Sequence, residues 1–419
     1  MSLALIGTLL AFVIIIVLVN KKVPLHLSVL IGTILVGFSC SYNPLQLLET
    51  MWLALIDQPT TELLSIIALI CITSYLLQHF FLLKRAVEAL DRLMPSTKLT
   101  IMLVPMLIGC LTVAGGAIIS APMVDQLGER LDLTPRKRAA INLLYRHGGH
   151  FMFPFVPGII LASQLGGFSG TELAAMMIPI AIALLVLGYF ILLRGVASSN
   201  SNDAKRDIMK DLGGFVINGS PILTPLVLSI GLGQPFILSL SIGVALAIVL
   251  VLYNQRKDAK TFINEDVPPK IKPIDLVLGL YEQRKLLMTA ASIMIFRGII
   301  VATDVLRPFI SDMQAQGIPL PLLSVLFPFL IGYSTGQISS AIGICWPLLI
   351  PAGFVGPVVP LAMLMYCSGY CGYFFSPLHL CTVLTNGYFK VNLSDTYRDL
   401  LPVFVPIPIC MALLYWFNS

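Results

Sequence analysis

Long apolar runs constrain this chain more than any other feature of its sequence. Residues 3–19 and 235–253, for example, contain no Asp, Glu, Lys or Arg. A transmembrane helix needs about 20 predominantly apolar residues, whereas the strands of a membrane barrel alternate in polarity at every second residue. Because these runs are apolar on all sides, the sequence predicts an all-α polytopic membrane protein.

Composition supports this class and excludes others. Of the 419 residues, 57% are hydrophobic and 11% are charged, whereas soluble domains are about 25% charged. A soluble enzyme is therefore excluded, as are collagen-like, disordered and disulfide-scaffold chains. We expect ten transmembrane helices, at residues 3–19, 23–38, 61–82, 139–164, 173–193, 215–232, 235–253, 286–306, 359–384 and 401–417.

An internal repeat organises these segments. Pro105 and Gly109 match Pro328 and Gly332 at an offset of 223 residues (328 − 105), and Gly149 and Pro154 match Gly372 and Pro377 at the same offset. Chance is the alternative, since Pro and Gly are common, but several matches share one offset. The pattern favours two copies of one fold. Each copy contains an apolar segment interrupted by Gly and hydroxyl residues, 99–123 in the first and 319–351 in the second.

Basic residues indicate the orientation, because Lys and Arg in short loops mark the cytoplasmic side. Net charge is only +5, so placement matters more than the sum. Basic clusters flank segment 99–123, among them Lys98 and residues 136–138. They share one side of the membrane only if this segment enters and leaves on the same face. No Lys or Arg lies between 319–351 and the span that follows it. This is expected if 319–351 is a second re-entrant segment that enters the membrane from the outer face.

The predicted architecture is therefore about ten transmembrane helices plus two re-entrant hairpins, in two inverted-topology repeats. We expect an inner (cytoplasmic) membrane protein with both termini outside and no cleavable signal peptide. The first repeat, 1–196, holds three spans, an amphipathic arm (83–94), a hairpin (98–133), a broken helix (137–166) and a span (171–195). A cytoplasmic linker (197–212) leads to the second repeat, 213–419, with a hairpin (318–351) and a broken helix (357–387).

Irregular backbone inside a membrane is tolerated only where it is buried in protein or lines a cavity. In inverted-repeat transporters such breaks hold the substrate and the coupling ions. The predicted substrate-binding residues at the hairpin tips and helix breaks are Thr112, Gly115, Gly116, Ser120, Arg146, His147, His150, Thr335, Gln337, Ser339, Ser340, Ser376 and His379. The predicted ion-binding residues are Ala114, Gly149, Ser334, Gly372 and Asn386.

Ionisable residues inside a membrane are costly and often functional, yet each has a structural alternative. Arg146 could extend towards the interface instead of facing a ligand. His379 could be a buried, satisfied histidine or a ligand contact. Arg297 and Asp304 lie on one helix face and are interpreted as a packing pair. Cys367 and Cys371 are one helical turn apart, but we expect small buried side chains, with no disulfide and no metal site.

The sequence resembles the ion-transporter superfamily, which includes divalent-anion/sodium symporters and citrate and arsenite carriers. The strings AGGAIISAPMV (114–124) and FPFVPGIILAS (153–163) resemble a prokaryotic integral-membrane branch of unknown function. The resemblance implies a homodimeric elevator, with a scaffold of early spans in each half and a moving domain of hairpins and broken helices. Symporters of that superfamily carry Ser-Asn-Thr at both hairpin tips, and this chain does not.

The helix breaks contain no Asp or Glu, which favours an anionic solute over a carboxylate-based antiporter. We expect a secondary active transporter of a small, anionic organic solute, coupled to sodium or protons. It would have no enzymatic activity, no cofactor other than sodium as a coupling ion, and no nucleic-acid partner. The alternatives are a passive channel, a non-transporting membrane scaffold, or an intramembrane metalloenzyme using His147 and His150. The enzyme would need a third ligand that the sequence does not reveal.

Overall fold

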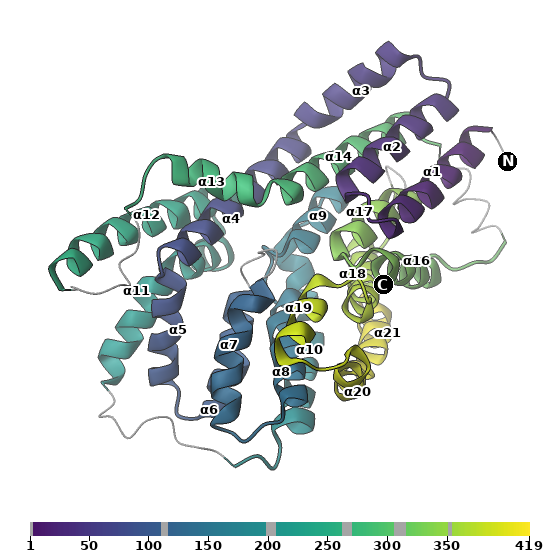
Figure 1. Cartoon of the computed structure of the whole chain (residues 1–419). Coiled ribbons are helices and arrows are strands. Elements are labelled where there is room, and N and C mark those ends of the chain that lie inside the picture. The colour runs from purple at the N-terminus through teal and green to yellow at the C-terminus, as the bar shows by residue number, and fades with distance from the viewer. Residues whose placement is uncertain (1–2, 110–115, 198–206, 262–269, 306–315, 351–353) are drawn as a thin grey trace.

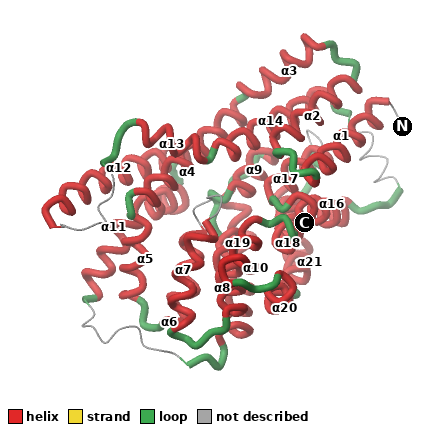
Figure 2. The backbone as a smooth tube through the Cα atoms, viewed as in Figure 1, coloured by secondary structure: helices red, strands yellow, loops and turns green. Residues whose placement is uncertain are grey.

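The computed structural model of the chain describes residues 3–109, 116–197, 207–261, 270–305, 316–350 and 354–419. Within these ranges the regular structure is helical, and no strand is present among them. Figure 2 shows the helices joined mostly by short turns. This agrees with the prediction of an all-α protein.

The first half opens with four apolar helices and a short amphipathic one (Figure 1). These are α1 (Leu3–Asn20), α2 (Leu25–Ser39), α3 (Pro44–Ile56), α4 (Gln58–His79) and α5 (Leu82–Leu93). A helix pair and an interrupted helix follow: α6 (Thr97–Gly109), α7 (Gly116–Glu129), α8 (Pro135–Gly148), the 3-10 turn η1 (Gly149–Phe151) and α9 (Pro157–Gly166). The half ends with α10 (Gly170–Gly188) and its π-helical extension η2 (Tyr189–Leu193).

The second half has a matching order of elements. It contains α11 (Ile208–Leu226) with the π-helical turn η3 (Val227–Gly231), α12 (Phe236–Thr261), α13 (Ile274–Glu282) and α14 (Arg284–Thr303). A helix pair and a second interrupted helix follow: α16 (Leu320–Thr335), α17 (Ile338–Leu349), α18 (Val358–Phe375) and α19 (Leu380–Phe389). The chain ends with α20 (Leu393–Phe404) and α21 (Pro406–Asn418).

Seven helical stretches among the described residues are long and apolar enough to span a membrane. They coincide with seven of the ten expected spans. The other three are shorter or interrupted. The apolar helical stretches at residues 4–19 and 25–39 are shorter than the seven, and α8 with α9 is broken between Gly148 and Pro157. The protein is therefore a multi-pass helical membrane protein.

Helix α5 is strongly amphipathic. Its apolar side, including Leu83, Val87 and Leu90, is buried, while Lys84 and Glu88 are exposed. Arg92 donates from Nε to Asp211 Oδ1 at 2.8 Å, so α5 is joined to α11, against which it packs. The helix therefore connects the two halves of the chain.

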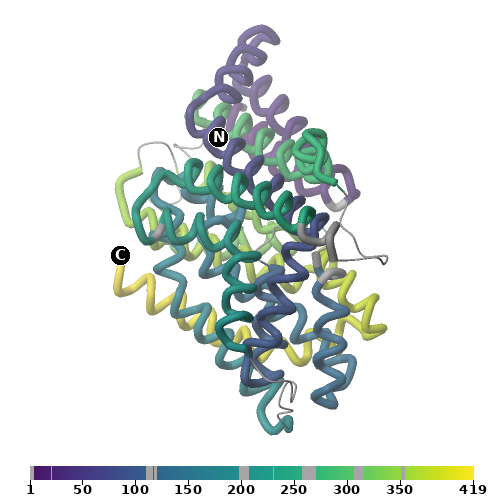
Figure 3. Tube along the Cα trace, turned by 90° about the vertical axis from the view of Figure 1, so that its left-hand side faces the viewer, coloured from purple at the N-terminus to yellow at the C-terminus, as the bar shows by residue number. Residues whose placement is uncertain are grey.

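The two halves pack in reciprocal pairs. Helix α2 contacts α14 and α12 contacts α4, while α3 contacts α14 and α13 contacts α4. Likewise α7 packs on α19 and α17 on α9. Figure 3 shows α11 and α12 running beside α4 and α5. Each contact in these reciprocal pairs has a counterpart between the corresponding helices of the other half.

Two glycines make the closest matching approaches. A Cβ on Gly109 of α6 would collide with the carbonyl oxygen of Arg146 on α8, and a Cβ on Gly332 of α16 would collide with that of Gly369 on α18. Both glycines and both carbonyls are related by the offset of 223 (332 − 109 and 369 − 146). A glycine at the matching position in each half therefore allows the helix pair to pack closely against the interrupted helix.

Candidate functional site

Local sequence explains the break in the first interrupted helix. Thr134 accepts from the Lys137 backbone N–H at 3.4 Å and caps α8, and Pro135 occupies a first-turn position that needs no donor. The helix ends at the glycines 148–149, a 3-10 turn follows, and α9 restarts with Pro157 at its N-terminus. Proline at 154 and 157 removes the donors that a continuous helix would require.

The second interrupted helix breaks at Ser376-Pro377. Ser376 has extended backbone (φ −68°, ψ 133°), the conformation that a following proline favours. Its hydroxyl donates to the Tyr333 carbonyl of α16 at 2.6 Å and accepts from the Leu378 N–H at 3.2 Å. The break is therefore held against the helix pair α16–α17.

The two interrupted helices meet through equivalent residues. The Tyr370 hydroxyl donates to the His147 carbonyl at 3.1 Å, and these residues are 223 apart (370 − 147). The ring centroids of His147 and Tyr373 are 5.9 Å apart, and those of His150 and Tyr370 are 6.2 Å apart. The second pair corresponds to the first, because 147 matches 370 and 150 matches 373 at the offset of 223. Positions 147 and 370 therefore lie where the matching segments cross.

Three histidines gather at this crossing. The ring centroid of His147 lies 5.0 Å from that of His150 and 4.8 Å from that of His379. His147 and His379 are each 1% exposed. Among the described residues, Nδ1 of His150 and Nε2 of His379 have no hydrogen-bond partner. The cluster brings together predicted residues from both halves of the chain.

The Cys381 side chain stands beside this cluster. One ligand atom each from His147, His379 and Cys381 lies within 4.8 Å of the other two. Neither Cys381 nor the contacting tyrosines, Tyr370 and Tyr373, were predicted as site residues. Their proximity depends on the crossing of distant helices, for which no local pattern in the sequence is a signal.

The second hairpin turn lies directly against the second break. Gly336 has φ +64°, and a Cβ there would lie 2.8 Å from the Leu378 carbonyl carbon, so both the conformation and the contact require glycine. Thr335 is buried and donates to the Ile331 carbonyl at 2.7 Å. Gln337 is exposed, and Ser334 and Ser339 are half-buried. Ser340 is buried, and its Oγ has no partner within the described ranges.

The predicted residues of the first hairpin tip are only partly placed. Thr112, Ala114 and Gly115 lie outside the described residues. Gly116 begins α7. Ser120 is buried on the same helix, and its hydroxyl donates to the Ala117 carbonyl at 3.3 Å.

A second buried polar cluster lies between α7, α8, α19 and α20. Asn142 Nδ2 donates to Thr385 Oγ1 at 3.0 Å, and the Thr396 hydroxyl donates to Asn386 Oδ1 at 2.8 Å. Asn142 Oδ1 and Asn386 Nδ2 have no partner among the described residues. Asn386 was predicted from the sequence, but Asn142 and Thr385 were not. The signal for Asn142 was an amide inside an apolar run.

The remaining predicted residues take packing positions. Gly149 abuts Phe153 and Met106, and a Cβ on Gly372 would collide with the Phe329 carbonyl. Arg146 is 3% exposed, which disfavours its extension to the interface. The interpretation of Arg297 and Asp304 as an ion pair was wrong: within the described residues Arg297 forms its ion pair with Asp57, at the N-terminal end of α4, at 3.9 Å.

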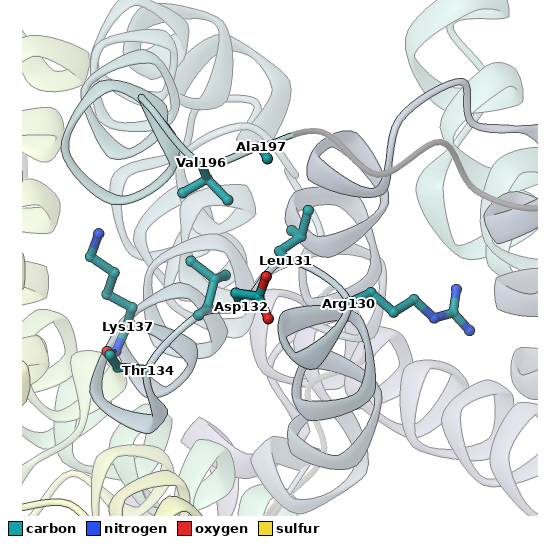
Figure 4. A pocket seen from close by; sticks show the side chains of 8 residues that line it. Arg130, Leu131, Asp132, Thr134, Lys137, Val196 and Ala197 are labelled. Atoms are coloured by element: carbon teal, nitrogen blue, oxygen red, sulfur yellow. Dashed lines mark hydrogen bonds between the residues drawn. The ribbon is translucent and has the colours of Figure 1, made fainter.

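Two cavities have no histidine among the described residues that line them. A surface pocket of about 430 Å³ lies at the turn between α7 and α8, with Arg130 and Lys137 on opposite sides (Figure 4). A smaller pocket is lined by Ser339 and Pro157 and by residues of α4 and α14, among them Leu63 and Ile293. The smaller pocket joins the second hairpin turn and the start of α9 to the flanking helices.

Comparison with known proteins agrees with a transporter-type fold. A solved structure of the YdaH transporter from Alcanivorax borkumensis matches with a TM-score of 0.57 at 16% sequence identity, over 86% of this chain and 85% of that one. At this identity the likeness concerns the fold alone. No curated protein matches the sequence. A family model described as "Protein of unknown function (DUF401)" matches residues 3–417, and since this is nearly the whole length, the chain belongs to that family.

Proposed function

We propose that this protein is a secondary active transporter of a small, anionic organic solute, driven by sodium or protons. The observation that carries the proposal is the crossing of two interrupted helices, α8–α9 and α18–α19, through matched residues. Broken helices at membrane depth expose backbone groups that can bind a solute or an ion. The fold likeness to the YdaH transporter supports the same class.

The chemistry of the breaks supports an anionic solute. Residues 147–157 and 372–379 contain no Asp or Glu, while Arg146 supplies a buried positive charge beside them. Ser339 and Ser340 offer hydroxyls in the hairpin whose turn packs against the second break. A charged guanidinium with several hydroxyl donors suits a carboxylate or similar group.

A sodium ion would need oxygen ligands instead of the positively charged and hydrogen-donating groups that suit an anion. We propose that the polar cluster of Asn142, Thr385 and Asn386 provides them, together with carbonyls near Gly149, Ser334 and Gly372. The oxygen Oδ1 of Asn142 is buried without a partner among the described residues, which supports a cation there. Amide, hydroxyl and carbonyl oxygens suit a hard cation.

An elevator mechanism requires one rigid moving body and one scaffold. Ion pairs join α8 to α20 through Arg136 and Asp399, and to α7 through Arg138 and Asp125. We assign these helices, with both hairpins and both broken helices, to the moving body. The spans α1, α2, α4, α11, α12 and α14 would form the scaffold. Inverted repeats and a homodimer belong to the same proposal, and the reciprocal contacts of the halves support the repeats.

Uptake of radiolabelled organic anions into proteoliposomes tests the proposal, with and without a sodium gradient. Candidate solutes come from a thermal-shift screen, because a ligand that binds the folded state raises its stability. We expect saturable uptake and counterflow, with uptake lost in Ser339→Trp. The matched control is Ser241→Trp, since Ser241 is exposed on α12. Normal uptake by Ser339→Trp would refute the site, and unsaturable conduction would indicate a channel.

A further inference from the structure

Burial of an imidazole nitrogen without a hydrogen-bond partner is energetically unfavourable, and at the crossing of the interrupted helices Nδ1 of His150 and Nε2 of His379 are buried in this way among the described residues. An unsatisfied buried polar group costs about 1–3 kcal/mol. Aromatic packing, such as His147 against Phe374 at 5.6 Å between ring centroids, accounts for the burial of the rings. It does not account for the Nε2 of His379, which has no hydrogen-bond partner in the described part of the chain.

We propose that His147, His379 and Cys381 form a binding site for a divalent transition-metal ion of the zinc type. Their ligand atoms all lie within 4.8 Å of one another. In a tetrahedral zinc site the ligand atoms are roughly 3.3–3.8 Å apart, since Zn–N is about 2.0 Å and Zn–S about 2.3 Å. Small rotations of the side chains would close this difference.

The imidazoles are already oriented as metal ligands usually are. Nδ1 of His147 is hydrogen-bonded to the Leu143 carbonyl at 2.8 Å, which makes this nitrogen the donor and leaves Nε2 with its lone pair. Nδ1 of His379 lies 3.4 Å from the Phe374 carbonyl, which can only accept, and 2.9 Å from Thr382 Oγ1. Its Nε2 is the unpartnered atom. Metal-binding histidines typically fix the remote nitrogen in this way, so that the other faces the ion.

The donor set selects the class of ion. Two imidazole nitrogens and one thiolate suit zinc and similar borderline ions, whereas magnesium and calcium require oxygen ligands. Three protein ligands leave a fourth position for water, a solute or a further side chain. His150 Nδ1 belongs to the same cluster and has no partner among the described residues. This inference concerns metal binding and does not depend on the proposed transport.

Cobalt(II) titration of the purified full-length protein in detergent, after removal of metals, tests the site. We expect one tetrahedral ion per chain, with intense visible absorption and a thiolate charge-transfer band. In Cys381→Ser the thiolate band should disappear and the affinity for zinc, measured by competition, should fall at least tenfold. Cys410→Ser is the matched control, because Cys410 lies on α21 outside the cluster, and it should keep both.

A second variant guards against misfolding of the first. Thr382→Val removes the hydroxyl beside His379 Nδ1 but keeps all three ligands, so the band should remain while affinity falls about 10- to 100-fold. Absence of a thiolate band in the wild-type protein would overturn the proposal. So would equal affinity in the wild type, Cys381→Ser and Thr382→Val. Because the assay contains no solute, its failure is distinct from a failure of transport.

Discussion

At the scale of single residues, glycine is required where the backbones of two helices lie very close together. A Cβ on Gly332 would meet two backbone groups of α18: the Gly369 carbonyl oxygen and, at 3.0 Å, the Tyr373 nitrogen. Neither can yield as a flexible side chain could. Gly109 faces the Arg146 carbonyl in the same manner. These contacts set the distance between each hairpin and its interrupted helix.

Replacing Gly332 by alanine should therefore destabilise the protein. Forcing an extra carbon into a packed interface costs about 1–3 kcal/mol, so the thermal unfolding midpoint in detergent should fall. Gly213→Ala is the control, because a Cβ there meets no described atom within 4 Å and alanine favours a helix by about 0.5–1 kcal/mol. A Gly332→Ala protein as stable as the wild type would contradict the close packing.

The histidine cluster marks the limit of sequence reasoning at this scale. Gly109 and Gly332 were found because matched glycines recur at a fixed offset. His147 and His379 are predicted as site residues because each lies at a glycine- and proline-containing break of an apolar helix. Their proximity to each other and to Cys381 follows from the crossing of α8 and α18, which involves residues from opposite halves of the chain. No spacing within either half encodes that contact.

At the scale of elements, charged ends tie the interrupted helices to their neighbours. Arg136, in the first turn of α8, forms an ion pair with Asp399 of α20, and one of its hydrogen bonds, from Nε to Oδ2, is 2.7 Å long. Arg138 contacts both Asp125 and Glu129 of α7. The first link joins two helices that are far apart in the sequence, and the second joins two helices that follow each other in it.

Removing the negative charge at 399 should loosen α20 from α8. We expect Asp399→Asn to lower the thermal unfolding midpoint at low ionic strength, and the double exchange Arg136→Asp with Asp399→Arg to restore part of the loss. Because Arg136 is partly exposed, salt should screen the interaction. The difference from wild type should therefore shrink in concentrated salt. A loss that is insensitive to salt would show that packing, and not charge, holds the two helices.

Two helices were absent from the expected elements. Helices α3 and α13 have 13 and 9 residues. They are too short to span a membrane, so the length of an apolar run does not reveal them. A local signal did exist for α3, since Asn43 and Gln46 form a capping box and Pro44 follows the cap. The breaks of α8–α9 and α18–α19, in contrast, were foreseeable because glycine and proline act locally.

At the scale of the whole molecule, the topology rests on the distribution of basic residues. Lys137 lies at the start of α8, beside the turn from α7, and the positive-inside rule predicts that this end faces the cytoplasm. The chain end at Ser419 is exposed and is predicted to lie outside.

Cysteine labelling in spheroplasts tests this assignment. A membrane-impermeant maleimide should label Ser419→Cys in intact spheroplasts but Lys137→Cys only after permeabilisation, with the parent protein giving the background of native cysteines. Labelling of Lys137→Cys in intact spheroplasts would reverse the orientation. It would also place the first hairpin on the opposite face.

The crossing of α8 and α18 has one more consequence. Positions related by the offset of 223 carry histidine at 147 and 150 but tyrosine at 370 and 373, so the two proposed repeats differ in sequence where they meet. If the two repeats exchanged conformations, the resulting structure would therefore differ from the starting one. The two end states of such a motion would have unequal populations at rest, and the metal ion proposed to bind the imidazoles would shift these populations if it bound one state more tightly.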